Sequence, residues 1–174
     1  MYFSSIYKSP LGNIYIVSDE NELISVAIEG QKRPQLPSIH QLPADQNLPI
    51  LKASEEWLSA YFEGKKPSPF DLPLARSGSE FRQIVMDLLL QIPYGSLRTY
   101  GDIAREIAQR RGIAQMASQA VGGAVGGNAI SIIIPCHRVV GANGNLTGYG
   151  GGLDLKMKLL KHEGVDTSRF HLPR

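Results

Sequence analysis

The 174-residue chain has a single cysteine, Cys136, and this scarcity excludes several kinds of protein. One cysteine cannot form an internal disulfide and offers no cysteine cluster for zinc, so we expect a reducing compartment and a site without metal. The four histidines show no ligand-like spacing with acidic residues. Apolar runs long enough to span a bilayer are missing, as is a basic N-terminal segment followed by an apolar core. We therefore expect a cytoplasmic protein without a membrane partner.

Excess charge of either sign is also missing. The formal net charge is +2, with 43% hydrophobic and 20% charged residues, which is ordinary for a globular protein. Nothing in this composition indicates disorder or a fibre. So small a positive excess does not by itself indicate nucleic-acid binding, and any basic face must be local.

The first part of the chain predicts an antiparallel sheet covered by a helix. Three segments rich in β-branched and aromatic residues are separated by turn-forming residues. The expected strands are 2–8, 14–18 and 23–29. Apolar residues then recur at helical spacing between Ile50 and Phe62, with Trp57 expected in the core. Residues 65–79 contain three prolines and read as a linker, so we expect domains at 1–76 and 77–174.

The second part predicts a mostly helical domain. Ser77 and Glu80 stand at capping-box spacing before an apolar helical face that ends at Pro93. Thr99 is a good N-cap for a short helix over 100–107, and a second helix is expected over 117–126. Two short helices joined by a turn suggest a helix-turn-helix.

The second of these helices has an unusual face. Ala120, Gly123, Ala124 and Gly127 recur at i, i+3, i+4 and i+7, so the face has almost no side chains. Each glycine inside a helix costs about 1 kcal/mol relative to alanine, so we expect a reason for it. Two interpretations stay open, namely packing against another helix and close approach of an external partner. The glycines match neither nucleotide-binding loop pattern.

Residues 131–140, Ser-Ile-Ile-Ile-Pro-Cys-His-Arg-Val-Val, place the cysteine beside a histidine in an apolar run. Pro135 fixes its own φ and favours an extended residue before it, so 132–134 predicts a strand that ends in a rigid turn at Cys136. A buried and inert cysteine is the plain alternative to a nucleophile. Neighbours in an extended chain point to opposite faces, so we expect a water relay between Cys136 and His137.

Two later segments offer partners for this pair. Residues 141–152 are rich in glycine and asparagine, and predict tight turns that could bring Tyr149 over the thiol. An amphipathic helix follows from Leu153 and ends at Gly164. Glu163 lies in its last turn, where a carboxylate opposes the helix dipole and gains from a partner such as histidine. Glu163 is our candidate to orient the imidazole.

Pro-Cys-His-Arg at the end of an isoleucine run resembles the active-site signature of the O6-alkylguanine-DNA alkyltransferases. Further motifs of that family follow in register over residues 81–164. They are Tyr94-Gly95, Thr99-Tyr100-Gly101, Ala120-Val121-Gly122-Gly123, Gly127-Asn128, Thr147-Gly148-Tyr149, Gly151-Gly152-Leu153, Leu159-Leu160 and His162-Glu163-Gly164. The resemblance implies an α+β fold with a ribonuclease-H-like N-terminal half. The C-terminal half would be mostly helical and winged-helix-like, with a helix-turn-helix.

The resemblance also implies a function. The protein would be a monomeric DNA repair protein that flips an alkylated guanine out of double-stranded DNA, with O4-alkylthymine as a second candidate substrate. It would transfer the alkyl group irreversibly to Cys136, once per molecule and without a cofactor. This is the activity of a methylated-DNA–protein-cysteine S-methyltransferase.

The resemblance assigns roles position by position, and each residue except the cysteine keeps an ordinary core or loop alternative. The implied catalytic residues are Cys136 as nucleophile, His137 as base through water, Glu163 as its partner and Asn128 as a hinge. The implied substrate pocket is Tyr100, Ser131, Val139 through its carbonyl, Tyr149 and Gly150 through its amide. The implied DNA contacts are Tyr100, Gln119, Ala120, Gly123, Ala124 and Arg138.

This sequence departs from the family pattern at three of its positions. Gln119 stands where an intercalating arginine is usual, which removes a positive charge from the expected interface. Ala129 replaces a proline that often follows the hinge asparagine, and Gly150 replaces a serine that some members carry.

Two other functions compete with alkyl transfer. A cysteine hydrolase would usually take its histidine from a distant part of the chain, so the adjacency of Cys136 and His137 fits it poorly. A binding module, either a helix-turn-helix regulator or an alkyltransferase-like protein that only recognises damage, would not need Cys136.

Overall fold

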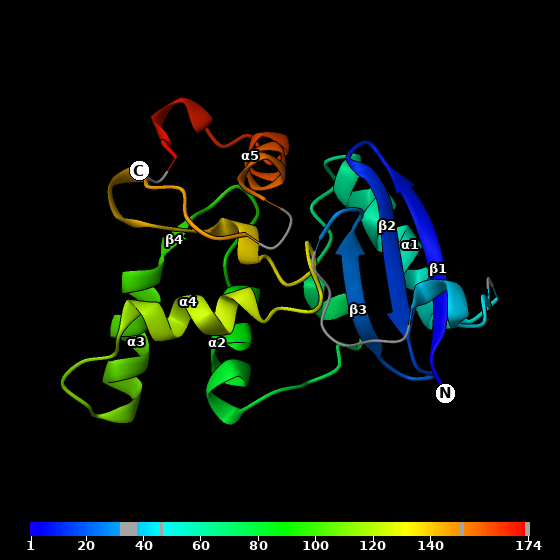
Figure 1. The fold of residues 1–174 in the computed structure, drawn as a ribbon, viewed down its shortest axis with the longest axis horizontal. Helices are drawn as coiled ribbons and strands as arrows, with labels where there is room; N and C mark the ends of the chain where they lie inside the picture. Colours follow the sequence, from blue (N-terminus) through cyan, green and yellow to red (C-terminus); the bar gives the residue numbers. More distant parts are fainter. Residues whose placement is uncertain (32–37, 46, 150–151, 173–174) are drawn as a thin grey trace. The chain divides into compact units, whose positions relative to one another are not determined.

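The computed structural model describes residues 1–31, 38–45, 47–149 and 152–172. Its fold is α+β, as expected, and the chain divides into two compact units (Figure 1). The first unit comprises Met1–Arg76 with Ala129–Ile133, and the second comprises Ser77–Asn128 with Ile134–Arg174. None of the helices in the described part is long and apolar enough to cross a membrane.

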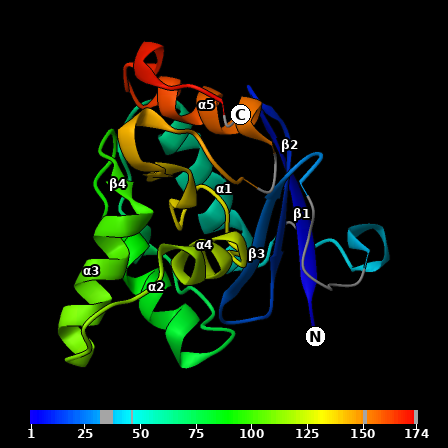
Figure 2. The ribbon, with the colours of Figure 1, turned by 60° about the vertical axis from the view of Figure 1, so that its left-hand side comes forward.

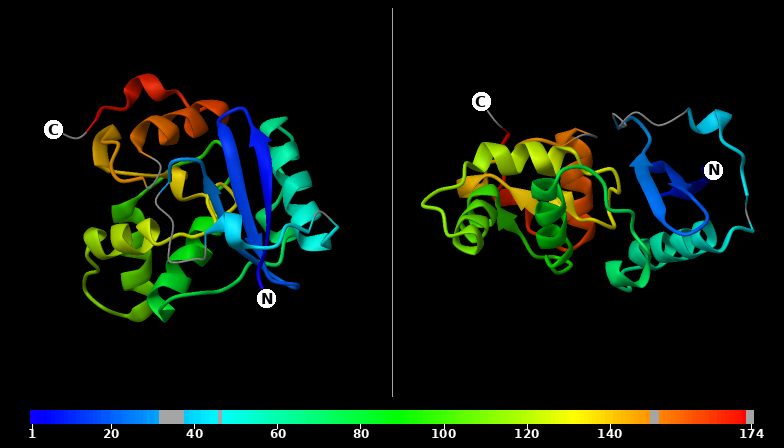
Figure 3. Two further views of the ribbon diagram at one scale, coloured as in Figure 1. Left: turned by 45° about the vertical axis from the view of Figure 1, so that its right-hand side comes forward. Right: turned by 90° about the horizontal axis from the view of Figure 1, so that it is seen from below.

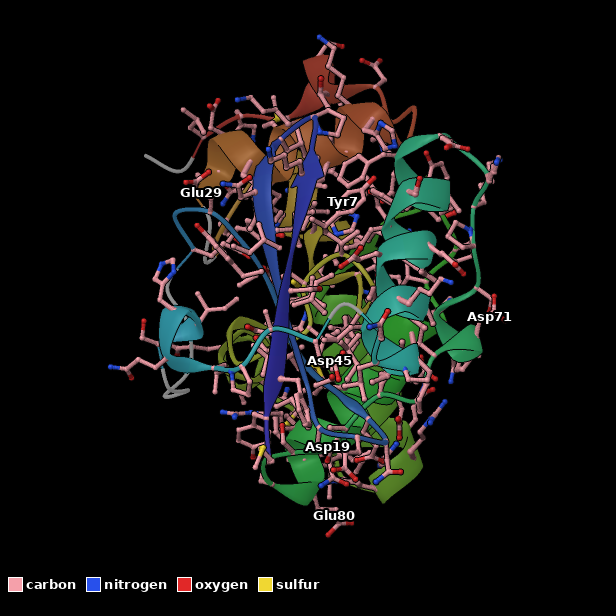
Figure 4. All side chains as sticks on the ribbon, turned by 90° about the vertical axis from the view of Figure 1, so that its right-hand side faces the viewer. Tyr7, Asp19, Glu29, Asp45, Asp71 and Glu80 are labelled. Atoms are coloured by element: carbon pink, nitrogen blue, oxygen red, sulfur yellow. The ribbon has the colours of Figure 1, made fainter. Side chains whose placement is uncertain are left out.

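The first unit is built on an antiparallel sheet of three strands in the order β1-β2-β3. The strands are β1 (Phe3–Ser9), β2 (Gly12–Ser18) and β3 (Leu23–Ile28), which confirms the predicted meander. Helix α1 (Pro49–Phe62) packs along one face of this sheet (Figure 3). The ring of Tyr7, a residue of β1, stacks on Phe62 of α1 with the centroids 6.4 Å apart (Figure 4). Trp57 is buried, as predicted.

The outer edge of β3 pairs with two segments from later in the chain. Leu23 N donates to Pro73 O at 2.8 Å, and Val26 N donates to Ala129 O at 2.9 Å. Ser131 N completes the second pairing by donating to Val26 O at 2.9 Å. The stretch 129–133 therefore belongs to the first unit, although a division at residue 76 would assign it to the second half.

The predicted strand over 132–134 is wrong. The extended segment ends once Ser131 has paired with β3, and the chain then turns sharply. Ile132 has the left-handed φ of 71°, and Ile133 N donates to Ser131 O at 2.9 Å. All three isoleucines are nonetheless buried. Their β-branched side chains predicted burial correctly, but the backbone follows the pairing of its neighbours.

The second unit is mostly helical (Figure 2). Its α-helices are α2 (Glu80–Leu90), α3 (Tyr100–Arg111), α4 (Ser118–Gly126) and α5 (Leu153–His162). Strands β4 (Arg98–Thr99) and β5 (Val139–Val140) form a short parallel pair. Helix α4 packs against both α2 and α3, which gives the predicted helix-turn-helix neighbours. The short 3₁₀ helices of the chain are η1 (Ile39–Gln41), η2 (Pro69–Asp71), η3 (Cys136–Arg138), η4 (Ala142–Gly144) and η5 (Thr167–Arg169).

The N-termini of α2 and α3 show how local chemistry sets helix boundaries. Thr99 caps α3 as predicted, because its Oγ accepts from Asp102 N at 3.0 Å while Asp102 accepts from Thr99 N at 3.1 Å. The predicted capping box of Ser77 and Glu80 is wrong. Ser79 caps α2 instead, accepting from Arg82 N at 3.2 Å, because an N-cap must directly precede the first helical residue.

Candidate active site

Cys136 lies on a tight turn that two hydrogen bonds define. Pro135 has φ −83° and ψ 63°, and Cys136 N donates to Ile134 O at 2.8 Å, which is an inverse γ-turn. The side-chain amide of Asn128 donates to the same Ile134 carbonyl at 2.9 Å. Asn128 therefore ties the end of α4 to the turn that carries the thiol. The turn at the cysteine was expected, but its form was not.

The Cys136 thiol is buried, with 6% of the residue exposed. Burial raises the pKa of the thiol above its ordinary value of 9.0, and the side chain of Asn128 and the charge of Lys156 oppose that rise. The thiol is therefore protonated near neutral pH. A reaction at this sulfur needs a base to take the proton.

His137 has the environment of such a base. Its ring is fully buried, and Nε2 forms a hydrogen bond with Glu163 Oε2. Burial lowers the pKa of the imidazole, although the Glu163 carboxylate opposes this effect, so the ring is neutral near pH 7. With the Nε2 proton directed at the carboxylate, Nδ1 has a free lone pair, and it has no hydrogen-bond partner among the described residues. Nδ1 is the atom that could accept a proton through water.

Glu163 follows α5 directly and holds three groups at once. Besides His137, it accepts from Arg138 Nε at 2.7 Å and from Gly95 N at 3.0 Å. Burial alone would raise the pKa of the carboxyl, but the hydrogen bonds and charges of His137 and Arg138 together lower it below its ordinary value of 4.5. The carboxylate is therefore ionised and fixed beside the imidazole.

The Arg138 side chain occupies an interior position. It is 8% exposed, pairs with Glu163 and donates from Nη1 to Ile92 O at 2.6 Å. The expected phosphate contact by Arg138 does not suit this geometry, because a DNA contact requires an accessible guanidinium. Its charge instead balances the buried carboxylate.

Lys156 is a residue of the site that the sequence reasoning missed. It lies on α5 and is fully buried, and its ammonium donates to Val139 O at 2.6 Å and to Thr147 O at 2.9 Å. A lysine on an amphipathic helix normally reads as solvated. Its spacing could have predicted the burial, because Lys156 stands three residues after Leu153 and four before Leu160, on the apolar face of the helix.

The expected pocket residues are placed as follows. Tyr100 is half-buried at the start of α3, and its hydroxyl donates to Thr147 O at 3.3 Å. Tyr149 is half-buried, and Val139 has its carbonyl bound to Lys156. Ser131 is buried in the first unit. Gly150 lies outside the described residues.

The exposed face of α4 differs in part from the predicted one. Gln119, Ala120 and Gly123 are exposed, but Ala124 is 6% exposed and packs inward. This burial does not favour the expected DNA contact by the Ala124 side chain. Helix geometry places Gly126 in the exposed set instead, three residues after Gly123.

The glycines of α4 and its C-cap separate the two interpretations of the bare face. A Cβ at Gly127 would lie 2.7 Å from Cζ of Arg82 on α2, so a side chain there would require the end of the Arg82 side chain to move. A Cβ at Gly123 or Gly126 would meet nothing within 4 Å. Packing within the described residues therefore does not require these two glycines, and they leave room for an external partner.

Comparison with known proteins decides the family. Residues 80–165 match the model for the 6-O-methylguanine DNA methyltransferase DNA binding domain, and residues 2–76 match the ribonuclease-like domain of the same proteins. The chain belongs to the 6-O-methylguanine DNA methyltransferase family. In the described residues of this methyltransferase, no three or more His, Cys, Asp or Glu side chains gather as metal ligands would.

Individual relatives cover nearly the whole methyltransferase chain. A methylated-DNA–protein-cysteine methyltransferase of Methanosarcina acetivorans is 44% identical over 165 residues, which are 94% of this chain and 99% of the relative. The Haemophilus influenzae protein of the same name is 36% identical, covering 94% of this chain and 87% of that one. Mycobacterium tuberculosis OGT, in a crystal structure with DNA, matches with a TM-score of 0.79 and 38% identity over 97% of this chain and 94% of that chain.

Proposed function

We propose that this protein repairs DNA by moving the alkyl group of an O6-alkylguanine in duplex DNA onto Cys136, once per molecule. O4-alkylthymine is a second candidate substrate. The observation that carries the proposal is the buried His137–Glu163 pair, whose histidine directly follows Cys136, in a chain of this methyltransferase family. A cysteine hydrolase would need water to release the acyl group from the sulfur in a second step. Alkyl transfer ends when the sulfur has accepted the alkyl group.

The chemistry follows from the protonation states. Nδ1 of His137 accepts the Cys136 proton through a water, and the ionised Glu163 stabilises the imidazolium that results. The thiolate attacks the alkyl carbon, so an S–C bond forms as the bond from that carbon to O6 breaks. The electron pair of the broken bond stays on the guanine, which takes up a proton from water while the imidazolium of His137 returns its proton to water. A thioether is a poor leaving group, so the protein is consumed.

The reacting base has to leave the helical stack. Flipping costs a few kcal/mol, and the vacated space must be filled. We assign groove entry to the exposed Ala120 and Gly123 of α4, where side chains are small enough for close approach, with Gln119 as the residue that fills the gap. Tyr100 would turn the phosphate of the flipped nucleotide.

The flipped guanine would lie against Tyr149 and the Val139 carbonyl, with Ser131 and the Gly150 amide as further contacts. We place Asn128 as the hinge between α4 and the thiol, supported by its bond to Ile134 O. Residues 77–174 would then form the domain that carries DNA binding and transfer, and 1–76 the ribonuclease-like domain. We propose a monomer in the cytoplasm, where a reduced thiol persists.

The direct test is mass spectrometry of the protein mixed with one equivalent of duplex DNA that contains a single O6-methylguanine. We expect a gain of one methylene on the peptide that bears Cys136, stopping at one per protein. Undamaged duplex and Cys136→Ser are the controls, and both should show no gain. Binding without any gain would contradict transfer, and repeated turnover of ester or amide substrates would favour a hydrolase.

A further inference from the structure

Lys156 is a fully buried cation. None of the carboxylates in the described ranges forms an ion pair with it. Its neighbours Leu159 and Leu160 on α5 are equally buried, and an apolar side chain would fill the same volume without the cost of desolvating a charge. The lysine therefore needs a reason that packing does not supply.

The contacts of the ammonium give that reason. Its three donors meet three backbone carbonyls, Val139 O at 2.6 Å, Thr147 O at 2.9 Å and Gly148 O at 3.4 Å. Val139 directly follows the 3₁₀ turn of Cys136–Arg138, and Thr147–Gly148 directly precedes Tyr149. One charged group thus joins the segment after the nucleophile to the segment before Tyr149 of the expected guanine pocket.

Tyr100 completes the same cluster. Its hydroxyl donates to the Thr147 carbonyl that Lys156 also binds, and Nζ lies 5.8 Å from the centre of the Tyr100 ring. The titratable groups that interact with the ammonium are Cys136, His137 and Tyr100. The ammonium favours a thiolate on Cys136, and it disfavours an imidazolium on His137 because it lowers the pKa of that ring.

We propose that Lys156 is a positioning residue for alkyl transfer, whose ammonium fixes the Val139 and Thr147 carbonyls of the pocket and supplies positive charge to the Cys136 thiolate. This inference rests on the proposed function. Only the protonated amine carries three hydrogen-bond donors. The protonated form is therefore the one that both fixes the carbonyls and supplies positive charge to the thiolate. Lys156 gives up no proton in the reaction, because the thiol proton goes to His137.

Burial lowers the pKa of Lys156 from 10.5 to about 8, while the thiolate of Cys136 favours the charged form. The reciprocal effect lowers the pKa of the thiol, against the rise that burial causes. Removing the charge should therefore raise the pH at which Cys136 becomes reactive.

The test compares Lys156→Met with Lys156→Arg, which keeps the charge, and with Lys158→Met as the matched control. Lys158 is on the same helix, its side chain is 59% exposed, and its Nζ lies 3.7 Å from Oδ2 of Asp154. We expect Lys156→Met to slow single-turnover methyl transfer about tenfold at pH 7, the effect of one pKa unit on the thiolate. Duplex affinity should not change, Lys156→Arg should recover part of the rate, and Lys158→Met should match wild type.

A second readout works without DNA. The pH midpoint for iodoacetamide alkylation of Cys136 should rise in Lys156→Met and in Lys156→Gln, but not in Lys158→Met. Unchanged transfer rates and an unchanged midpoint in the folded variants would overturn the inference. If Lys156→Met does not fold, Lys156→Gln and Lys156→Arg give the same comparison. Failure of the wild-type protein to transfer would overturn the proposed function, while the iodoacetamide midpoint would still decide the role of Lys156.

Discussion

Replacing Glu163 by glutamine removes one buried negative charge and almost no volume. The carboxylate accepts from His137, from two nitrogens of Arg138 and from Gly95 N, whereas a glutamine amide presents one oxygen and one NH₂ group. The NH₂ must then face a donor, and Arg138 keeps a buried charge without its counter-ion. Removing one partner of such a buried pair costs about 3–5 kcal/mol.

For a chain of this length, each kcal/mol shifts the melting temperature by about 2–4 °C, so we expect a fall of about 6–20 °C. The measurement is thermal or urea unfolding of wild type and Glu163→Gln, with Asp154→Asn as the control. Asp154 is 93% exposed and pairs weakly with Lys158, so its loss should cost less than about 1 kcal/mol. A loss at Glu163 no greater than at Asp154 would refute the reasoning.

The pH dependence gives an independent check. The pKa of Glu163 is lowered in the fold, so its contribution is present above the ordinary value of 4.5 and is lost as the pH falls through the folded value. The stability gap between wild type and Glu163→Gln should therefore be full at pH 7 and narrow below pH 4.5. A gap that stays constant down to acid unfolding would mean that the carboxylate charge is not what stabilises the site.

Further predictions concern α4, its groove contact and the cap of α3. Gly123→Ala should stabilise the fold by about 0.5–1 kcal/mol, because the added Cβ meets nothing within 4 Å. The same variant should bind duplex DNA more weakly in an anisotropy titration. An unchanged affinity would show that Gly123 of α4 is not part of the DNA interface. Gln119→Arg should tighten binding and steepen the salt dependence by about one unit of slope, and an unchanged slope would show that this position does not reach the phosphates. Thr99→Ala should cost about 1 kcal/mol in urea unfolding, whereas no loss would mean that its capping box contributes nothing.

The sequence predicted elements best where a local rule decides them. The three strands, α1 and the Thr99 cap follow from side-chain periodicity and capping chemistry within a few residues. Ile132 shows the opposite case, because β-branched residues favour a strand while pairing of Ser131 with distant Val26 ends the extended segment. Long-range pairing is not visible in local propensity.

The nucleophile, the base and its carboxylate partner could be predicted from the sequence, but the two buried cations of the site could not. The pairing of His137 with Glu163 came from the need of a base for a carboxylate partner and from the family resemblance. Arg138 and Lys156 were assigned to the surface or left out, because basic side chains are solvated unless a buried acceptor holds them. Those acceptors, Glu163 and a set of backbone carbonyls, lie far away in sequence.

The pairing of Val26 with residues 129 and 131 has a consequence for how the protein is made. While the ribosome has released only the first 76 residues, the Val26 N–H and C=O on the outer edge of β3 have not met their partners. An unpaired strand edge is a template for association with other chains. More than fifty further residues must therefore be synthesised before the edge of β3 at Val26 can be paired. A fragment that ends at residue 76 would leave this edge unpaired and would tend to aggregate.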